Sequence, residues 1–261
     1  MTWDPKQYQR FGDERSRPFH ELVQRINAGP KDLKQIVDLG CGPGNLTATL
    51  TERWPIAKVI GVDNDANMLA TAQSLASPQL NFVSGDLAAW RPAEPTNAII
   101  SNAAYQWVPD HLPVVSKHLD FLEPGGWLAF QVPGNLDDLH HQAIRSLYRS
   151  PRWSKHSALA ELPDRTHSSH SAVAYLDTLA GQCAQIDAWE TTYVHVLQGS
   201  DPVLEWVKGT ALRPILSLLP DETSRNEFLD ELGSQLRDLY PAKAWGTPFP
   251  FKRVFVVGQR R

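Results

Sequence analysis

The chain has 261 residues, of which 42% are hydrophobic and 21% charged, a composition typical of globular proteins. The formal net charge of -4 and the pI of about 6.1 argue against a broad nucleic-acid-binding face. No apolar run reaches the roughly 18 residues that span a bilayer, and the first residues lack the apolar core of a signal peptide. With only Cys41 and Cys183 present, we expect a cytoplasmic protein without a disulfide framework and without membrane or nucleic-acid partners.

The first half of the chain alternates between strand-like and helix-like segments. A helix is predicted over 17–26, because apolar residues recur there at helical spacing. Strands are predicted at 35–39, 58–62, 80–83, 98–101 and 127–132, with helices at 45–54, 65–76 and 112–122. This alternation predicts an α/β fold with a doubly wound, mostly parallel sheet and helices on both faces.

The alternation ends after Val132. Residues 134–182 are polar and rich in histidine and serine, and they are predicted to form an inserted helical segment with loops. A long strand is predicted at 185–196, helices at 201–210 and 222–239, and a last strand at 249–257. The insertions are expected to form a cap beside the sheet and no independent domain.

A glycine-rich loop, Gly40-Cys-Gly-Pro-Gly44, follows the first predicted strand. In doubly wound sheets ligands bind at the carboxyl ends of strands, where glycine allows a sharp turn and a close approach. Asp63 ends the second strand, 19 residues after Gly44, and can accept hydrogen bonds from both hydroxyls of a ribose. The pattern predicts a nucleoside-containing ligand; the alternative is a loop that only makes a tight turn.

Two details favour S-adenosylmethionine over a nicotinamide dinucleotide. Asn45 stands where a dinucleotide site has glycine or alanine. The carboxylate of Asp38, just before the loop, suits a sulfonium or ammonium group and repels a pyrophosphate.

Two more stretches follow predicted strands. Ser84-Gly-Asp-Leu87 follows the third strand, and its Asp86 either accepts from an adenine amino group or caps a turn. Ser101–Trp107 follows the fourth strand, at the centre of the predicted rim. Its Tyr105 and Trp107 either contact the substrate or pack beneath the cap.

Five stretches together resemble the class I S-adenosylmethionine-dependent methyltransferases: VDLGCGPGN (37–45), GVDNDANML (61–69), SGDLAAW (84–90), SNAAYQWVPDH (101–111) and LEPGG (122–126). The flanking segments extend the similarity. With WDPKQYQRFGDERSRP (3–18), WETTYVHVL (189–197), LEWVKGTALRP (204–214) and PFKRVFVVGQR (250–260), the chain resembles the trans-aconitate 2-methyltransferase family over nearly its whole length.

This resemblance implies a seven-stranded sheet whose last strand is antiparallel. It also implies methyl transfer from S-adenosylmethionine to a carboxylate of trans-aconitate, which gives a monomethyl ester. We expect one domain over 1–261: residues 1–30 cover cofactor and substrate, 31–132 bind the cofactor, and 133–183 and 198–247 are cap insertions. The expected cofactor contacts are Arg15, Asp38, Gly40, Gly42, Asp63, Asn64, Met68, Asp86, Leu87 and Asn102.

The chemistry requires no general base, because a carboxyl group with a pKa of about 4 is already ionised at pH 7. Catalysis then rests on orientation and desolvation, and no residue is predicted to be catalytic. Groups that pair with carboxylates are expected instead. The candidates for substrate binding are Arg17, Tyr105, Trp107, Tyr193, His195 and Arg213.

Each candidate has a structural alternative. Arg15 and Arg17 are also consistent with solvated charges beside Asp13 and Glu14, and Lys208 with a surface charge. Arg213 is also consistent with a cap of a helix C-terminus. Tyr193 and His195 alternate on a predicted strand and so face one side, although His195 is also consistent with a half-buried strand histidine.

Other functions stay open on sequence alone. They are methylation of another small or carrier-bound carboxylate, such as a malonyl thioester, and cofactor binding without catalysis. A DNA amino-methyltransferase is disfavoured, because Asn-Ala-Ala-Tyr at 102–105 replaces the Asp/Asn-Pro-Pro-aromatic tetrad of those enzymes. The spacing of His156, His167 and His170 matches no metal site, so no metal is predicted.

Overall fold

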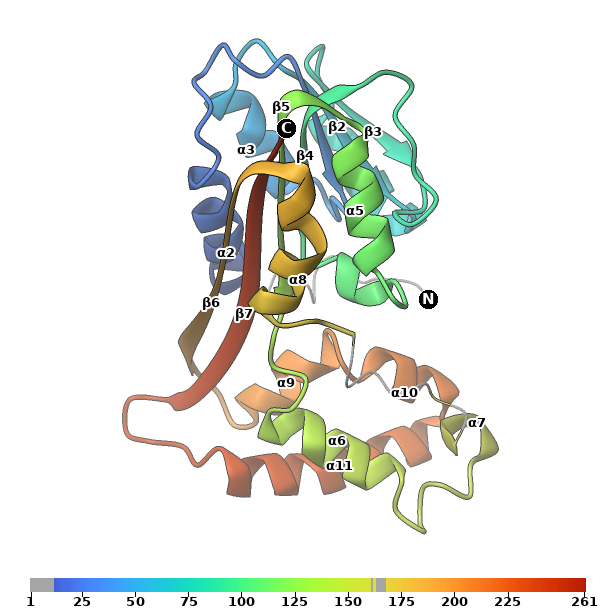
Figure 1. The fold of residues 1–261 in the computed structure, drawn as a ribbon. Coiled ribbons are helices and arrows are strands. Elements are labelled where there is room, and N and C mark those ends of the chain that lie inside the picture. The colour runs from blue at the N-terminus through green and yellow to red at the C-terminus, as the bar shows by residue number, and fades with distance from the viewer. Residues whose placement is uncertain (1–11, 161, 163–167) are drawn as a thin grey trace. The chain divides into compact units, whose positions relative to one another are not determined.

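The computed structural model describes residues 12–160, 162 and 168–261 (Figure 1). The strands in these ranges are β1 (Gln35–Leu39), β2 (Lys58–Asp63), β3 (Leu80–Ser84), β4 (Thr96–Asn102), β5 (Leu122–Pro133), β6 (Cys183–Leu197) and β7 (Thr247–Arg260). They form one sheet in the order β3-β2-β1-β4-β5-β7-β6, in which β1 to β5 pair in parallel and β7 is antiparallel to β5. The predicted fold class, with seven strands and an antiparallel last strand, is confirmed.

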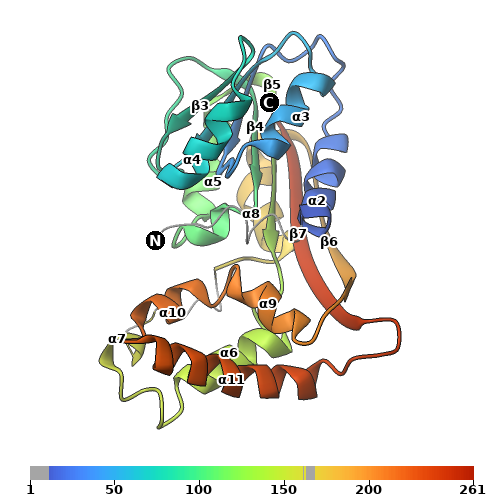
Figure 2. The same ribbon diagram turned by 180° about the vertical axis from the view of Figure 1, so that it is seen from behind.

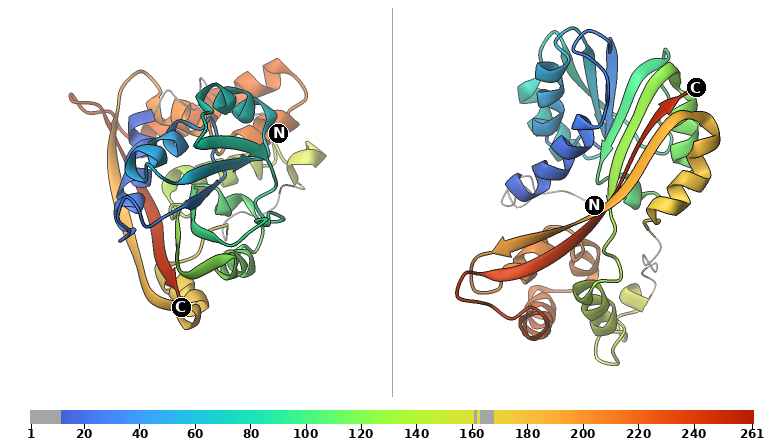
Figure 3. Two further views of the ribbon diagram at one scale, coloured as in Figure 1. Left: turned by 90° about the horizontal axis from the view of Figure 1, so that it is seen from above. Right: turned by 60° about the vertical axis from the view of Figure 1, so that its left-hand side comes forward.

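Helices cover both faces of the sheet, as predicted. Figures 1 and 2 show α2 (Gly12–Gln24), α3 (Asn45–Arg53) and α4 (Ala66–Ala72) on one face, and α5 (Leu112–Asp120) and α8 (Ala172–Leu179) on the other. The right-hand view of Figure 3 shows α2 and α3 on one side of the sheet and α8 on the other. The start of α4 is fixed by Asp65, whose carboxylate accepts hydrogen bonds from the backbone N–H groups of Asn67 and Met68.

The first described helix begins earlier than the sequence predicts. It starts at Gly12 instead of Arg17, so Pro18 lies inside the helix and not in its first turn. Proline costs a helix one hydrogen bond, but its φ is helical, and packing of the apolar face can outweigh that loss. Phe19 and Leu22, on the predicted apolar face, are completely buried.

The chain forms two compact units. The first comprises residues up to Gly134, Ser168–Thr191 and Arg253–Arg261, and the second comprises Asn135–His167 and Thr192–Lys252. Strands β6 and β7 contribute residues to both. The second unit overlaps the segments expected to be cap insertions, 133–183 and 198–247, but α8 belongs to the first unit. That the second unit forms a cap stays a prediction.

One hydrophobic core of the first unit lies between the sheet and helices α5 and α8. Leu39, Ile99 and Phe130 from the strands meet Val115 of α5 and Tyr175 of α8, and all five are completely buried. The long apolar runs of β1 and β4 are explained by this packing, because strands covered on both faces bury side chains on both.

The second unit is helical apart from the ends of β6 and β7. It contains α6 (Leu139–Tyr148), α7 (Ser157–Ala160), α9 (Pro202–Lys208), α10 (Arg213–Leu218) and α11 (Glu222–Leu239). Helix α11, which has the predicted bounds, packs against α6 and α9. The Phe228 ring of α11 meets the buried Trp153 edge to face, with ring centroids 5.1 Å apart. None of the helices in the described part is both long and apolar enough to cross a membrane.

Candidate active site

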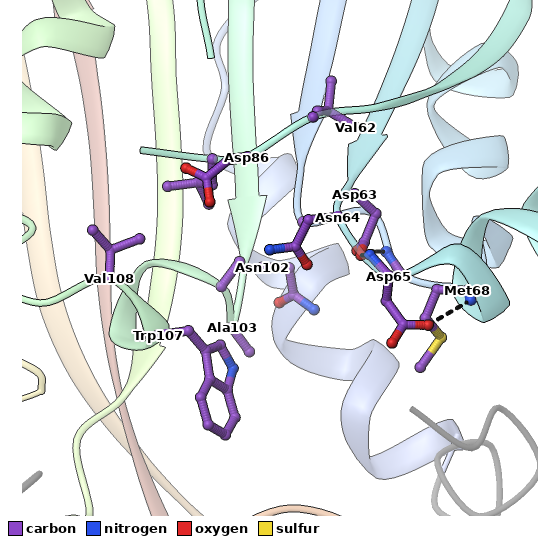
Figure 4. A pocket seen from close by; sticks show the side chains of 15 residues that line it. Val62, Asp63, Asn64, Asp65, Met68, Asp86, Asn102, Ala103, Trp107 and Val108 are labelled. Carbon is purple, nitrogen blue, oxygen red and sulfur yellow. Dashed lines mark hydrogen bonds between the residues drawn. The ribbon is translucent and has the colours of Figure 1, made fainter. Parts of the chain in front are cut away.

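A cavity of about 400 Å³ lies in the first unit, at the carboxyl ends of β1 to β4 (Figure 4). The sheet order reverses between β1 and β4, so the cavity lies at the topological switch point where doubly wound folds bind ligands. Its lining residues are Gly40, Gly42, Val62, Asp63, Asn64, Asp65, Met68, Gly85, Asp86, Leu87, Asn102, Ala103, Ala104, Trp107 and Val108. Eight of the expected cofactor contacts are among them: Gly40, Gly42, Asp63, Asn64, Met68, Asp86, Leu87 and Asn102.

The two lining glycines of the loop after β1 have different roles. Both have a left-handed backbone, with φ of +77° at Gly40 and +58° at Gly42. A Cβ at Gly40 would lie 2.3 Å from the Cβ of Ala104, so glycine lets this loop approach the loop after β4. A Cβ at Gly42 would meet no heavy atom within 4 Å. Gly42 therefore leaves the backbone open to a ligand in the cavity.

Asp63, at the end of β2, is held in place by the backbone around it. Its Oδ2 accepts a hydrogen bond from the N–H of Gly42 at 2.8 Å, and its Oδ1 accepts one from the N–H of Asp65 at 2.9 Å. Burial raises the pKa of this carboxyl, while both backbone hydrogen bonds oppose the shift. Each oxygen keeps a second lone pair, so the carboxylate can accept two ligand hydroxyls.

Asp38 is placed differently from the expectation, because it is buried and is not among the lining residues. Its Oδ2 accepts a hydrogen bond from the hydroxyl of Thr47 at 2.6 Å, and burial raises its pKa to about 7. Its Oδ1 is buried without a hydrogen-bond partner among the described residues. A cationic group nearby would lower the pKa again. The preference of Asp38 for a sulfonium or ammonium ligand stays a prediction.

Two further carboxylates line the cavity. Asp86 accepts a hydrogen bond from the N–H of Ala89 at 3.0 Å, so it stabilises a turn and also faces the cavity. The sequence interpretation did not include Asp65, although an aspartate directly before a helical segment is a recognisable cap. Figure 4 shows Asp63 and Asp65 together on one side of the cavity and Asp86 away from them.

Asn102 ends β4 and points into the cavity (Figure 4). Its Oδ1 accepts a hydrogen bond from Nε2 of Gln131 on β5 at 2.6 Å. The next residue, Ala103, has a positive φ of 56°, an uncommon conformation for alanine, and its N–H donates to the backbone oxygen of Gln131 at 2.9 Å. The end of β4 is therefore anchored to β5 by both side chain and backbone.

The side chains of Tyr105 and Trp107 lie in different environments. Tyr105 is completely buried, its hydroxyl lies 2.6 Å from Nδ1 of His118, and its ring packs edge to face on Phe130. The structure therefore favours the alternative, a packing role, for Tyr105, and its contact with substrate stays a prediction. Trp107 is partly exposed, and Figure 4 shows its ring among the side chains that line the cavity.

The arginines of the N-terminal segment lie on α2. The side chain of Arg15 falls outside the described part of the structure. Arg17 is mostly exposed and pairs with Glu21 at 2.7 Å, one helical turn away. It does not line the cavity, so the structure favours the alternative of a solvated charge over substrate binding at this position.

The remaining candidates lie in the second unit. Tyr193 and His195 are both buried on one side of β6, whereas Val194 and Val196 between and after them are exposed, which confirms the predicted alternation. The His195 ring stacks on Trp206 with centroids 4.8 Å apart. His195 is therefore more deeply buried than the half-buried alternative proposed.

Arg213 is the first residue of α10. The alternative that it caps a helix C-terminus is therefore wrong, because a cation at a helix N-terminus opposes the helix dipole. Lys208 ends α9 and pairs with Glu205 at 2.8 Å. The structure therefore favours the alternative for Lys208, a surface charge held in a local ion pair.

The first unit also contains two buried histidines, His111 and His118. The His111 ring bonds to the hydroxyl of Tyr175 at 2.7 Å, and burial lowers the pKa values of His111 and His118 to about 4. Both are therefore neutral at pH 7. In the described ranges no three His, Cys, Asp or Glu side chains form a group that could hold a metal ion; His167 lies outside them.

Comparison with known proteins adds sequence relatives of similar length. Residues 36–126 match the family model described as "Methyltransferase domain". A trans-aconitate 2-methyltransferase of Streptomyces avermitilis is 46% identical over 264 residues, which cover 99% of this chain and 97% of the relative. One of Mycobacterium tuberculosis is 41% identical over 259 residues, covering 98% and 96%.

Solved structures show the same fold. The YcgJ protein of Bacillus subtilis superposes with a TM-score of 0.59 at 16% identity, covering 94% of this chain and 98% of that protein. A phosphoethanolamine N-methyltransferase 2 of Haemonchus contortus gives a TM-score of 0.55 at 13% identity, covering 94% of this chain and 53% of that protein. At these identities the likeness concerns the fold alone.

Proposed function

The chain belongs to the trans-aconitate 2-methyltransferase family, within the class I S-adenosylmethionine-dependent methyltransferases, and on this premise we propose that it esterifies a carboxylate of trans-aconitate. The products are a monomethyl ester and S-adenosylhomocysteine. The observation that carries the proposal is the identity of 41–47% with such enzymes over nearly the whole chain.

The cavity fits the cofactor that this reaction requires. Asp63 would accept the ribose hydroxyls, the open side of Gly42 would let the ligand approach the backbone, and Asp86 would accept from the adenine amino group. The unpartnered Oδ1 of Asp38 suits a donor or a cation. When bound, S-adenosylmethionine supplies an electrophilic methyl group on a sulfonium centre.

The acceptor needs orientation more than activation. Its carboxylate is ionised at pH 7, so it would accept the methyl group without the help of a protein base. Asp63, Asp65 and Asp86 line the cavity and repel an anionic acceptor from their part of it. Among the lining side chains, the amides of Asn64 and Asn102 and the indole of Trp107 carry N–H donors that are compatible with a carboxylate.

The acceptor's other carboxylates would be paired by cationic or hydroxyl groups. Arg213, Tyr193 and His195 of the second unit stay the predicted partners. The position of Arg213 at a helix N-terminus supports a role outside helix stabilisation. An arginine there would offer two parallel hydrogen bonds to one carboxylate.

Methyl transfer to a panel of acids tests the proposal. The purified protein is incubated with methyl-labelled S-adenosylmethionine and trans-aconitate, cis-aconitate, citrate, tricarballylate or a malonyl thioester. We expect base-labile label in trans-aconitate, and a product whose mass is that of a monomethyl ester. Label in the malonyl thioester alone would support the carrier-bound alternative, and no label in any acid would refute a carboxylate methyltransferase.

A further inference from the structure

Three side chains form a continuous hydrogen-bonded chain from the interior of the first unit to the cavity. Nη1 of Arg253 on β7 donates to Oε1 of Gln131 at 3.1 Å, and Nε2 of Gln131 donates to Oδ1 of Asn102 at 2.6 Å. Gln131 is completely buried and Arg253 nearly so, and neither lines the cavity. Asn102 and Gln131 are register partners on adjacent strands, which holds their side chains side by side.

The chemistry of these groups determines which way each amide points. A guanidinium has only donors, so the group of Gln131 that faces Arg253 must be its oxygen. The amide nitrogen of Gln131 therefore faces Asn102, and it requires an acceptor there, which is Oδ1. The nitrogen of the Asn102 amide is left for the cavity, and it makes no hydrogen bond to the described residues.

We propose that Arg253 and Gln131 are positioning residues that lock the Asn102 amide as a hydrogen-bond donor for a carboxylate in the cavity. The other polar side chains that face the cavity include three carboxylates, Asp63, Asp65 and Asp86, which are acceptors when ionised. A carboxylate ligand is repelled by these and is stabilised by the fixed donor at Asn102.

This inference rests on the proposed function, which offers two sources for the carboxylate. One is the reacting carboxylate of the acceptor acid, and the other is the carboxylate of the cofactor's amino-acid part. Both would use the same donor in the same way. Ligands with and without each group tell the two sources apart.

Gln131→Glu should reverse the orientation of the Asn102 amide, and it hardly changes the shape of the side chain at position 131. Glutamate accepts from Arg253 as glutamine does, and its charge pairs with the guanidinium. It can only accept from Asn102, so the Asn102 amide must turn its nitrogen inward and its oxygen to the cavity. The loss of one donor to a charged acceptor predicts about 10- to 100-fold weaker binding of the carboxylate ligand.

The binding of three probes is measured by calorimetry for wild type and Gln131→Glu. 5′-Methylthioadenosine lacks the amino-acid carboxylate, S-adenosylhomocysteine carries it, and trans-aconitate is added to the S-adenosylhomocysteine complex. Unchanged methylthioadenosine binding with weaker S-adenosylhomocysteine binding assigns the donor to the cofactor's carboxylate. Weaker trans-aconitate binding alone assigns it to the acceptor.

The Asn102 side-chain amide signal provides a second readout that needs no turnover. Nitrogen NMR identifies it as the side-chain pair missing in Asn102→Asp, and the carboxylate ligand should shift it in wild type. Arg253→Met, which frees Gln131 to rotate, should give a smaller loss of affinity than Gln131→Glu. Gln259→Glu makes the same change on β7, opposite Trp127 at the other end of β5, and should change no affinity.

Two results would overturn the inference. One is a Gln131→Glu protein that binds all three probes as wild type does. The other is an equal loss for all three, methylthioadenosine included, which indicates general damage to the cavity. Failure of the proposed function is distinct, because it would appear as absent methyl transfer by the wild type.

Discussion

The two units of the molecule present their polar groups in different ways. In the first unit, the cavity is built from backbone turns at strand ends, and each key carboxylate is held by backbone N–H groups, as Asp63 is by Gly42 and Asp65. In the second unit, Tyr193 and His195 lie on the buried face of β6, where the ring of His195 stacks on Trp206 of α9. We infer that the first unit is preorganised for a nucleoside by its fold, whereas recognition in the second depends on the placement of individual side chains.

The largest expected effect comes from adding one methyl group to the loop. Gly40→Ala places a Cβ 2.3 Å from that of Ala104 at a φ of +77°, so the two loops must separate. We expect a loss of about 3–4 kcal/mol in the free energy of unfolding, together with loss of S-adenosylhomocysteine binding. Denaturant unfolding and calorimetry measure both.

Two other glycines sharpen this comparison. Gly42→Ala meets no atom within 4 Å and should cost only about 1 kcal/mol of stability while it still obstructs the ligand. Gly181→Ala also meets nothing within 4 Å, has no left-handed φ, and should change neither quantity. If Gly40→Ala and Gly181→Ala had the same stability and the same affinity for S-adenosylhomocysteine, the cavity would not depend on the backbone of the glycine loop.

Asp63→Ala should weaken S-adenosylhomocysteine binding about 100-fold, because the two charge-assisted hydrogen bonds proposed to the ribose would be lost. The N–H of Gly42 would also lose its acceptor. Calorimetry measures the dissociation constant. Asp65→Asn is the matched control: asparagine caps α4 as well as aspartate does, so stability should be kept. An unchanged affinity in Asp63→Ala would remove Asp63 from the ribose site.

The pH dependence of stability tests the buried carboxyl beneath the loop. Burial raises the pKa of Asp38 from 3.8 to about 7, so the folded protein holds this proton more tightly than the unfolded chain. Its contribution to stability is therefore greatest below pH 4 and is lost as the pH rises toward 7. Asp38→Asn removes the titration and leaves Thr47 an acceptor.

Relative to wild type, Asp38→Asn should gain stability as the pH rises from about 4 to 7, by roughly 1.4 kcal/mol for each pH unit between the two pKa values. Urea unfolding of both proteins at a series of pH values measures the difference. A difference that does not change with pH would show that Asp38 titrates at its ordinary value.

Sequence reasoning served the first unit better because its signals are local. A strand, a glycine turn and an acid after the next strand are enough to identify Gly40, Gly42 and Asp63 from the order of residues alone. The role of Gln131 could not be found in this way, because it depends on the register of β4, β5 and β7. Tyr105 and Trp107 lie two residues apart in one turn, and no local pattern shows which is buried.

The second unit was predicted less completely for a related reason. Helix α11, with 18 residues, is long enough for its periodicity to fix both ends. Helix α10 has six residues and begins at Arg213-Pro214, too short for a periodic signal. The helix position of Arg213 therefore emerged only from the fold, and with it the contrast between Arg213 and Lys208.

The smallest predicted effect concerns Arg213 and Lys208 and is measured on the KM for the acid. Arg213→Ala should raise the KM for the acid about 10-fold and leave S-adenosylhomocysteine affinity unchanged, because one carboxylate loses a charged partner. Lys208→Ala removes an equal charge from the same unit, but Lys208 is satisfied by Glu205, so its KM should stay at the wild-type value. Steady-state kinetics and calorimetry separate the two variants. If Arg213→Ala lowered only the melting temperature, Arg213 would be structural, and acid recognition would have to be sought among Tyr193, His195 and the first unit's own Asn102.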